Sequence, residues 1–122
     1  MDTFVVTMTA KPGSDAKISD FYLKQEAQYE AAKGFRGRQV LMSRPGTMAG
    51  ILSQHMSKEE MAKHPEPEGG SRGAHFVIIE QWDSAEDRMV WSMARDKTAD
   101  RELFPHLLPE HSHEFYDDLT GE

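Results

Sequence analysis

The chain has 122 residues, a formal net charge of −7, a pI of about 5.3 and no cysteine. This length predicts one domain with a sizeable core. The acidic balance argues against a nucleic-acid partner, because such binding depends on lysine and arginine meeting phosphates. The lack of cysteine excludes disulfides, thiolate metal sites and cysteine nucleophiles. No apolar run is long enough for a membrane span and no secretory signal is present, so we expect a soluble cytoplasmic protein without a membrane partner.

The residue patterns in the first half of the chain predict a strand, a helix and a second strand. Residues 3–10 alternate in a strand pattern, with two faces formed by Phe4, Val6 and Met8 and by Val5, Thr7 and Thr9. Apolar residues then recur at helical spacing from Asp15 to Lys33, and Gly34 supplies a stop. Gly37–Ser43 is the second predicted strand.

The second half repeats this order. His75–Trp82 alternates as a third strand, and Ser84 is placed to cap the helix that follows, with Asp87 three positions on. The apolar stripe expected on this helix is Ala85, Met89 and Met93. A short helical segment is expected over residues 100–108, interrupted near Pro105. The last strand is expected over residues 111–119, with the polar content of an edge or partner-facing strand.

Residues 44–74 form an insertion in this single domain of residues 1–122. A connection of about thirty residues is far longer than a hairpin needs. Within it, Gly50–Ser53 is a candidate short strand, Ser57–Glu60 is a capping-box pattern that starts a helical turn, and residues 65–73 have the composition of a mobile loop. A flexible decoration, a lid over a pocket and a dimer arm all remain open for this insertion.

The element order predicts an α+β fold of the ferredoxin-like βαββαβ type. Its four-stranded antiparallel sheet carries two helical segments on one face. Large apolar residues occupy both faces of the first and third strands, and the chain has no further long element to cover the second face. A second copy, packed sheet against sheet, is the expected cover, so the predicted partner is the protein itself as a homodimer.

Three motifs resemble the antibiotic biosynthesis monooxygenase family of dimeric α/β barrels. Lys11-Pro12-Gly13 ends the first strand, Gly34-Phe35 follows the helix, and Gln81-Trp82-Asp83-Ser84 joins the third strand to the next helix. The resemblance covers both ends of the chain and fails across residues 44–74. It implies a dimeric barrel and, for the family's best-known members, cofactor-free oxidation of anthrones or phenols to quinones. Other members degrade haem.

The chain departs from both catalytic patterns of that family. Trp91 lies nine positions after Trp82, much as the catalytic tryptophan of haem-degrading members does. Those members also have an asparagine where this chain has Val6 and a haem-ligating histidine near Asp100. In the anthrone oxidases, Trp82 resembles a site tryptophan, while a tyrosine and an asparagine of their pocket are replaced here, by Arg88 and Ile78.

Four aromatic residues are the candidate substrate-binding set. A cofactor-free oxygenase has to hold an aromatic acid, favour its anion and exclude water. The residues expected to line such a pocket are Phe4, Phe76, Trp82 and Trp91. Plain core packing is the alternative for each of them. Trp91 is the strongest candidate, because it falls off the apolar stripe of its helix.

Histidines are the candidate general bases. His111 and His113 share one face of the last predicted strand, where alternate side chains converge. His75 opens the third strand, and His55 lies in the insertion, from which a closing lid would bring a base to the pocket. Metal binding, an exposed position and an interface position are the alternatives for the histidines. Because no carboxylate completes a metal-ligand spacing, we expect no metal.

These observations predict a cofactor-independent monooxygenase that oxidises a small aromatic, quinol- or anthrone-like metabolite with dioxygen. No cofactor is expected, and the small aromatic ligand is the only non-protein partner expected besides oxygen. Two alternatives remain open: a dimeric protein that binds a small ligand without turning it over, and a haem-binding or haem-degrading monooxygenase.

Overall fold

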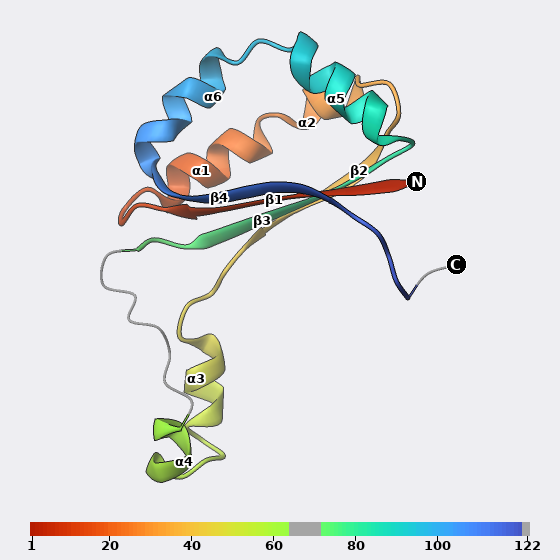
Figure 1. Ribbon diagram of the computed structural model, residues 1–122. Coiled ribbons are helices and arrows are strands. Elements are labelled where there is room, and N and C mark those ends of the chain that lie inside the picture. Colours follow the sequence, from red (N-terminus) through yellow and green to blue (C-terminus); the bar gives the residue numbers. More distant parts are fainter. Residues whose placement is uncertain (64–71, 121–122) are drawn as a thin grey trace.

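The computed structural model describes residues 1–63 and 72–120, and its centre is one four-stranded antiparallel sheet (Figure 1). The strands lie in the order β2-β3-β1-β4, so β2 and β4 are the edges. Their bounds are Asp2–Ala10 for β1, Phe35–Met42 for β2, His75–Trp82 for β3 and Leu107–Tyr116 for β4. This is the predicted βαββαβ arrangement, including an edge position for the last strand.

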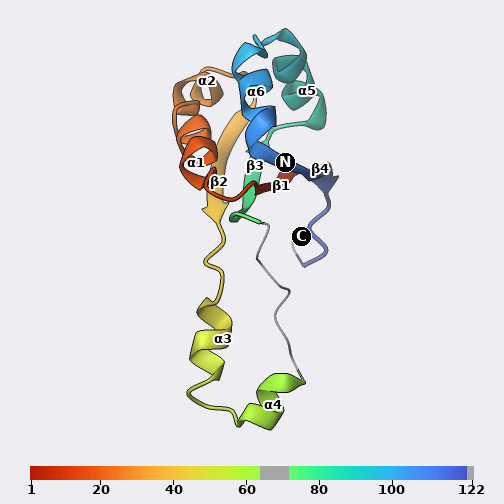
Figure 2. The ribbon, with the colours of Figure 1, turned by 90° about the vertical axis from the view of Figure 1, so that its left-hand side faces the viewer.

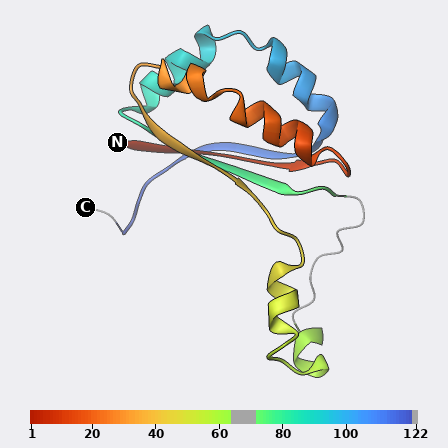
Figure 3. The ribbon, with the colours of Figure 1, turned by 180° about the vertical axis from the view of Figure 1, so that it is seen from behind.

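The helices that flank the sheet lie on one face of it (Figures 1 and 3). They are α1 (Asp15–Leu23), α2 (Glu26–Glu30), α5 (Ala85–Ala94) and α6 (Thr98–Leu103), followed by the 3₁₀ turn η1 (Phe104–His106). The core lies between the two layers. Its fully buried members from β3 are Phe76, Ile78, Glu80 and Trp82, and the helices contribute Ile18, Tyr22 and Tyr29. The period-two pattern of the strands therefore sets which side chains face the helices.

Two differences from the sequence prediction come from tertiary contacts. The helix expected over Asp15–Lys33 is divided into α1 and α2, and Arg38 of β2 donates from Nη2 to the carbonyl oxygen of Tyr22 at 2.6 Å. That oxygen is the acceptor that an unbroken helix would present to residue 26. The apolar stripe identified from the sequence as Ala85, Met89 and Met93 does not face the core, since Met89 is 41% and Met93 68% exposed.

The last strand begins four residues earlier than predicted, at Leu107, and ends at Tyr116 instead of Leu119. Its register against β1 shifts between the Ala10–Leu107 and Met8–His111 pairs. Pro109 falls within this irregularity on an edge strand, where the missing backbone N–H leaves no ladder bond broken.

The insertion forms an arm that projects from the sheet on the side away from the helices (Figure 2). Its helices are α3 (Thr47–Leu52) and α4 (Lys58–Ala62). The candidate strand over Gly50–Ser53 is wrong, because Gly50, Ile51 and Leu52 form the last turn of α3, whose backbone is bonded within the helix. The expected helical turn after Ser57 is confirmed, since the Ser57 hydroxyl accepts the Glu60 backbone N–H at 3.2 Å. Most of the loop predicted over residues 65–73 lies outside the described residues.

The second face of the sheet carries no helix in the described part of the chain. Val5, Val77 and Ile79 are half-buried on this face, and Leu41 is exposed beside them. The structure thus reproduces the uncovered apolar face from which a second copy was predicted. Among the helices described, none is long and apolar enough to cross a membrane.

Candidate active site

A cavity of about 400 Å³ lies between the helix layer and the sheet. Its size falls within the range of small-molecule sites. The apolar side chains on the wall are Val6, Met8, Phe21, Leu103, Phe104, Leu107, Leu108 and Pro109. The polar side chains on the wall are Tyr22, Gln25, Tyr29, Arg88, Arg95, Asp100, His111 and His113. The cavity therefore combines apolar side chains with an equal number of charged and hydrogen-bonding residues.

The register of β4 brings the two predicted histidines to this cavity. His111 pairs with Met8 and His113 with Val6, both of which face the helices. The two imidazole rings lie 5.6 Å apart. Both histidines are exposed residues at the edge of the cavity, and partial desolvation of the His113 ring, followed by the charges of His111 and Arg88, lowers the pKa of His113. A neutral imidazole is therefore favoured at neutral pH, as a general base requires. No group of three or more metal-ligating His, Asp or Glu side chains occurs among the described residues.

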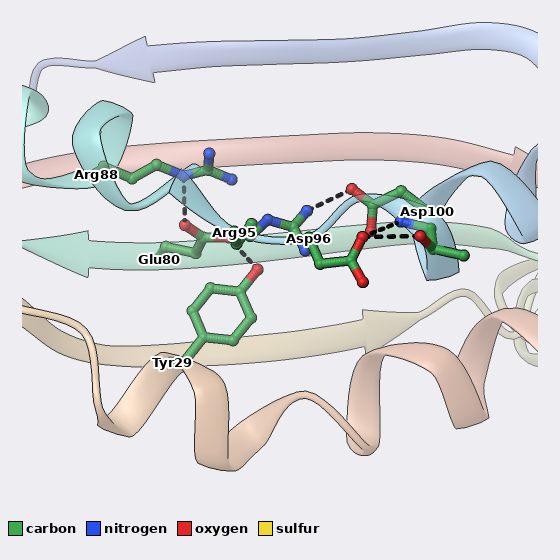
Figure 4. A network of polar contacts seen from close by, with 7 residues as sticks. Tyr29, Glu80, Arg88, Arg95, Asp96 and Asp100 are labelled. Atoms are coloured by element: carbon green, nitrogen blue, oxygen red, sulfur yellow. Dashed lines mark hydrogen bonds and ion pairs between the residues drawn. The ribbon is translucent and has the colours of Figure 1, made fainter. Parts of the chain in front are cut away.

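A buried carboxylate, Glu80, organises the floor beneath the cavity (Figure 4). Its Oε1 accepts from Trp82 Nε1 at 2.9 Å and from Arg88 Nε at 3.1 Å, and its Oε2 accepts from the Tyr29 hydroxyl at 2.9 Å. Burial and the Glu80 charge raise the pKa of Tyr29 far above its ordinary value. Tyr29 therefore stays protonated and acts as a donor.

Arg88 extends from α5 across this floor between aromatic rings. Its guanidinium carbon lies 4.2 Å from the ring centroid of Phe4 and 5.4 Å from that of Trp91. The flat cation is stacked as well as ion-paired, a combination that suits arginine better than lysine. These contacts fix the guanidinium plane at the cavity wall.

A second ion pair on the cavity wall joins Arg95, the residue after α5, to Asp100 of α6. Arg95 Nη2 donates to Asp100 Oδ2 at 2.5 Å, while Arg95 Nε and Asp100 Oδ1 are buried without a partner among the described residues. Tyr22 lies on the same wall, and burial followed by the Asp100 and Glu80 charges raises its pKa well above the ordinary range. Both tyrosines of the wall thus remain neutral.

The other predicted site residues lie off the cavity wall. Phe4, Phe76 and Trp82 are buried in the core, and Trp91 is half-buried behind Tyr29, with their ring centroids 4.5 Å apart. His75 is exposed at the start of β3, where its Nδ1 lies 3.0 Å from the Thr9 hydroxyl. His55 is exposed on the arm. The structure brings His111 and His113 together at one cavity and leaves His75 and His55 apart from it.

Sequence reasoning missed the charged residues of the site: Glu80, Arg88, Arg95 and Asp100. One signal was available for Glu80. It occupies the same alternation as Phe76, Ile78 and Trp82, so a carboxylate stood on a predicted buried face and required a cation. The alternation along the strand does not identify which arginine supplies this cation.

Comparison with known proteins places the fold. No family model matches the sequence, and no curated protein matches it. Solved structures do match: a proposed antibiotic biosynthesis monooxygenase from Nitrosomonas europaea has a TM-score of 0.64 and 13% identity, over 98% of this chain and 90% of that one. A mutant form of SnoaB from Streptomyces nogalater, a cofactor-independent oxygenase, has a TM-score of 0.60 and 11% identity, over 98% of this chain and 95% of that one.

A further structure, described as an antibiotic biosynthesis monooxygenase, matches with a TM-score of 0.62 and 11% identity, over 98% of this chain and 99% of that one. At such identities the likeness establishes the architecture and leaves the chemistry to the residues of this chain. The protein has the ferredoxin-like α+β fold of solved antibiotic biosynthesis monooxygenases, over nearly its full length.

Proposed function

We propose that the protein is a cofactor-independent monooxygenase that oxidises a small aromatic, quinol- or anthrone-like substrate with dioxygen. The observation that supports this proposal is a largely apolar cavity in which His113, with a lowered pKa, stands beside aromatic walls. The fold is shared with an oxygenase described as cofactor-independent. An apolar, aromatic site suits a substrate that supplies its own reducing electrons once deprotonated.

The reaction begins with removal of a proton from the substrate by neutral His113. For an anthrone, one hydrogen of the methylene between the aromatic rings goes to the imidazole, and the resulting anion gives an electron to dioxygen. Carbon–oxygen bond formation produces a peroxide anion, which takes the proton back from the imidazolium. Loss of water, formed from the second methylene hydrogen and the distal hydroxyl, leaves the carbonyl of the quinone. One methylene and one dioxygen thus give one carbonyl and one water.

Oxygen uptake with a panel of anthrones and quinols tests this function, with product identification by mass spectrometry. We expect His113→Gln to lower kcat/KM by about a hundredfold, the lower range for a lost general base. His75→Gln is the comparison, and we expect it to change the rate little because His75 alternates with the buried Phe76 and so lies on the sheet face opposite the helices and the cavity. Binding of the panel without oxygen uptake would contradict the proposal in favour of a non-catalytic ligand-binding protein.

The proposed mechanism predicts that kcat/KM decreases at acidic pH. Because the base has to be neutral, kcat/KM falls as the pH drops through the pKa of His113, which lies below the ordinary histidine value of about 6.5. We therefore expect the acid limb of the wild-type profile below that value and its loss in His113→Gln. An unchanged profile in His111→Gln/His113→Gln would remove both histidines from the mechanism.

A further inference from the structure

Arg88 is a buried cation whose terminal guanidinium nitrogens make no hydrogen bond within the described part of the chain. The residue is 7% exposed, and its Nε is committed to Glu80. Neither terminal nitrogen donates a hydrogen bond within the described part of the chain, and Figure 4 shows this end of the guanidinium pointing away from Glu80. The described side-chain atoms that are both sealed from solvent and unpartnered are Arg38 Nη1, Arg95 Nε and Asp100 Oδ1. The terminal nitrogens of Arg88 are not among these, so they remain open to the cavity that Arg88 lines.

The carboxylates near Arg88 are already ion-paired. Glu80 accepts three hydrogen bonds through its two oxygens, and Asp100 is paired through Oδ2 with Arg95, while none of the described contacts joins its Oδ1 to Arg88. Tyr22 and Tyr29 have raised pKa values and remain neutral phenols. The terminal nitrogens of Arg88 therefore have no protein anion to bind, and their N–H groups are available to an anion in the cavity.

The surroundings of the free donors select an aromatic ligand. Phe4 stacks on the guanidinium, and Phe21, Tyr22 and Tyr29 line the same cavity. A guanidinium presents parallel N–H groups that bind an oxyanion with short, charge-assisted hydrogen bonds. The low-polarity walls strengthen that attraction relative to water.

We propose that Arg88 is the anion-binding residue of this cavity and that the ligand is an aromatic molecule bound as its phenolate or enolate, with the ionised oxygen on the terminal nitrogens of Arg88. This inference rests on the proposed function, because the ionised substrate is the species that reduces dioxygen. It extends that function by naming the charged form that the site selects.

The probe is β-hydroxyanthraquinone, an oxidised ring system that the proposed reaction does not consume and whose anion absorbs in the visible. Titrating its absorbance against pH with saturating full-length protein gives the pKa of the bound hydroxyl. We expect this pKa to lie about one unit below that of the free ligand, which corresponds to about tenfold tighter binding of the anion. β-Methoxyanthraquinone, which does not ionise, is the matched ligand and should bind about as weakly as the neutral hydroxyl form.

The variant Arg88→Met/Glu80→Gln removes both charges of the ion pair together, so no buried carboxylate is left without a cation. We expect it to bind both ligands and to lose the shift. Arg36→Met is the matched control, because Arg36 forms an exposed ion pair with Asp83 outside the cavity, and it should keep the shift. His111→Gln/His113→Gln should also keep it, which separates the effect of Arg88 from titration of the histidines on β4.

An unshifted ligand pKa in the wild type, binding of neither ligand, or a wild-type shift in the Arg88→Met/Glu80→Gln variant would overturn the inference. Oxygen uptake reports on the proposed function separately. Anion preference without uptake from any anthrone or quinol contradicts the oxygenase and retains the Arg88 site. Uptake without anion preference contradicts the Arg88 site alone.

Discussion

At the scale of single residues, Glu80 and Arg88 have the largest consequences. Glu80 is 0% exposed and accepts from Trp82, Arg88 and Tyr29, which belong to three different elements. A buried carboxylate is tolerated only when it is paired and hydrogen-bonded. The same network holds the guanidinium of Arg88 at the cavity wall, so one arrangement serves both the core and the candidate site.

Arg88→Met is expected to lower the free energy of unfolding by about 3–5 kcal/mol, because it leaves Glu80 buried without a cation. Urea denaturation followed by tryptophan fluorescence measures this change. Adding Glu80→Gln should restore most of the loss, since the buried charge is then removed. Equal stability of the Arg88→Met variant and the wild type would contradict the role of Arg88 as the cation that buried Glu80 requires.

At the scale of elements, α5 determines how the site is assembled. Its residues Arg88 and Trp91 face the sheet and its methionines face outward, because Glu80 on β3 requires a cation at this position. The start of α5 is fixed by two contacts. Ser84 Oγ accepts the Asp87 backbone N–H at 3.1 Å, and Asp2 accepts the Ala85 backbone N–H at 2.7 Å. The predicted Ser84 cap is thereby confirmed.

Ser84→Ala is expected to lower the free energy of unfolding by about 1 kcal/mol, the usual cost of a lost N-cap. Ser57→Ala is the matched control, since Ser57 caps α4 on the projecting arm. Because the arm lies outside the sheet-and-helix body, loss of its cap should leave the global urea midpoint unchanged. A comparable loss in Ser57→Ala would mean that the arm unfolds together with the body.

At the scale of the whole molecule, the uncovered sheet face is the main feature left unexplained by a single copy. Val5, Val77 and Ile79 share this face with Leu41, and contiguous exposed apolar surface of this kind marks an interaction site. We propose that a second copy covers it. The arm projects on the same side of the sheet and so lies away from the cavity, which favours a role at the partner over a role as a lid.

Light scattering at micromolar concentration should therefore report a dimer, since stable homodimers commonly bury about 2,000 Å² or more. Ile79→Glu places a charge in the middle of the proposed interface and should produce monomers. Val90→Glu is the control, because Val90 is exposed on α5 on the opposite side of the sheet, and it should leave the dimer intact. A monomeric wild type would refute the proposed dimer.

The sequence by itself determined the order of the elements, the two faces of β1 and β3, the Ser84 cap and the pairing of His111 with His113 on one face. These features follow from local patterns: period-two alternation, capping chemistry and glycine or proline stops. Each depends on residues a few positions apart. The fold class was therefore accessible without coordinates, as the solved structures of the same architecture confirm.

Only the tertiary structure decided which way α5 faces, where the first helix breaks and which side chains line the cavity. Arg88 lies eight residues from Glu80, Tyr29 lies 51 residues from it, and Arg38 meets the Tyr22 carbonyl from another element. Such pairings depend on how the helices pack against the sheet. A charge on a buried strand face demands a partner, but the sequence does not identify it, because packing geometry selects one cation among several within reach.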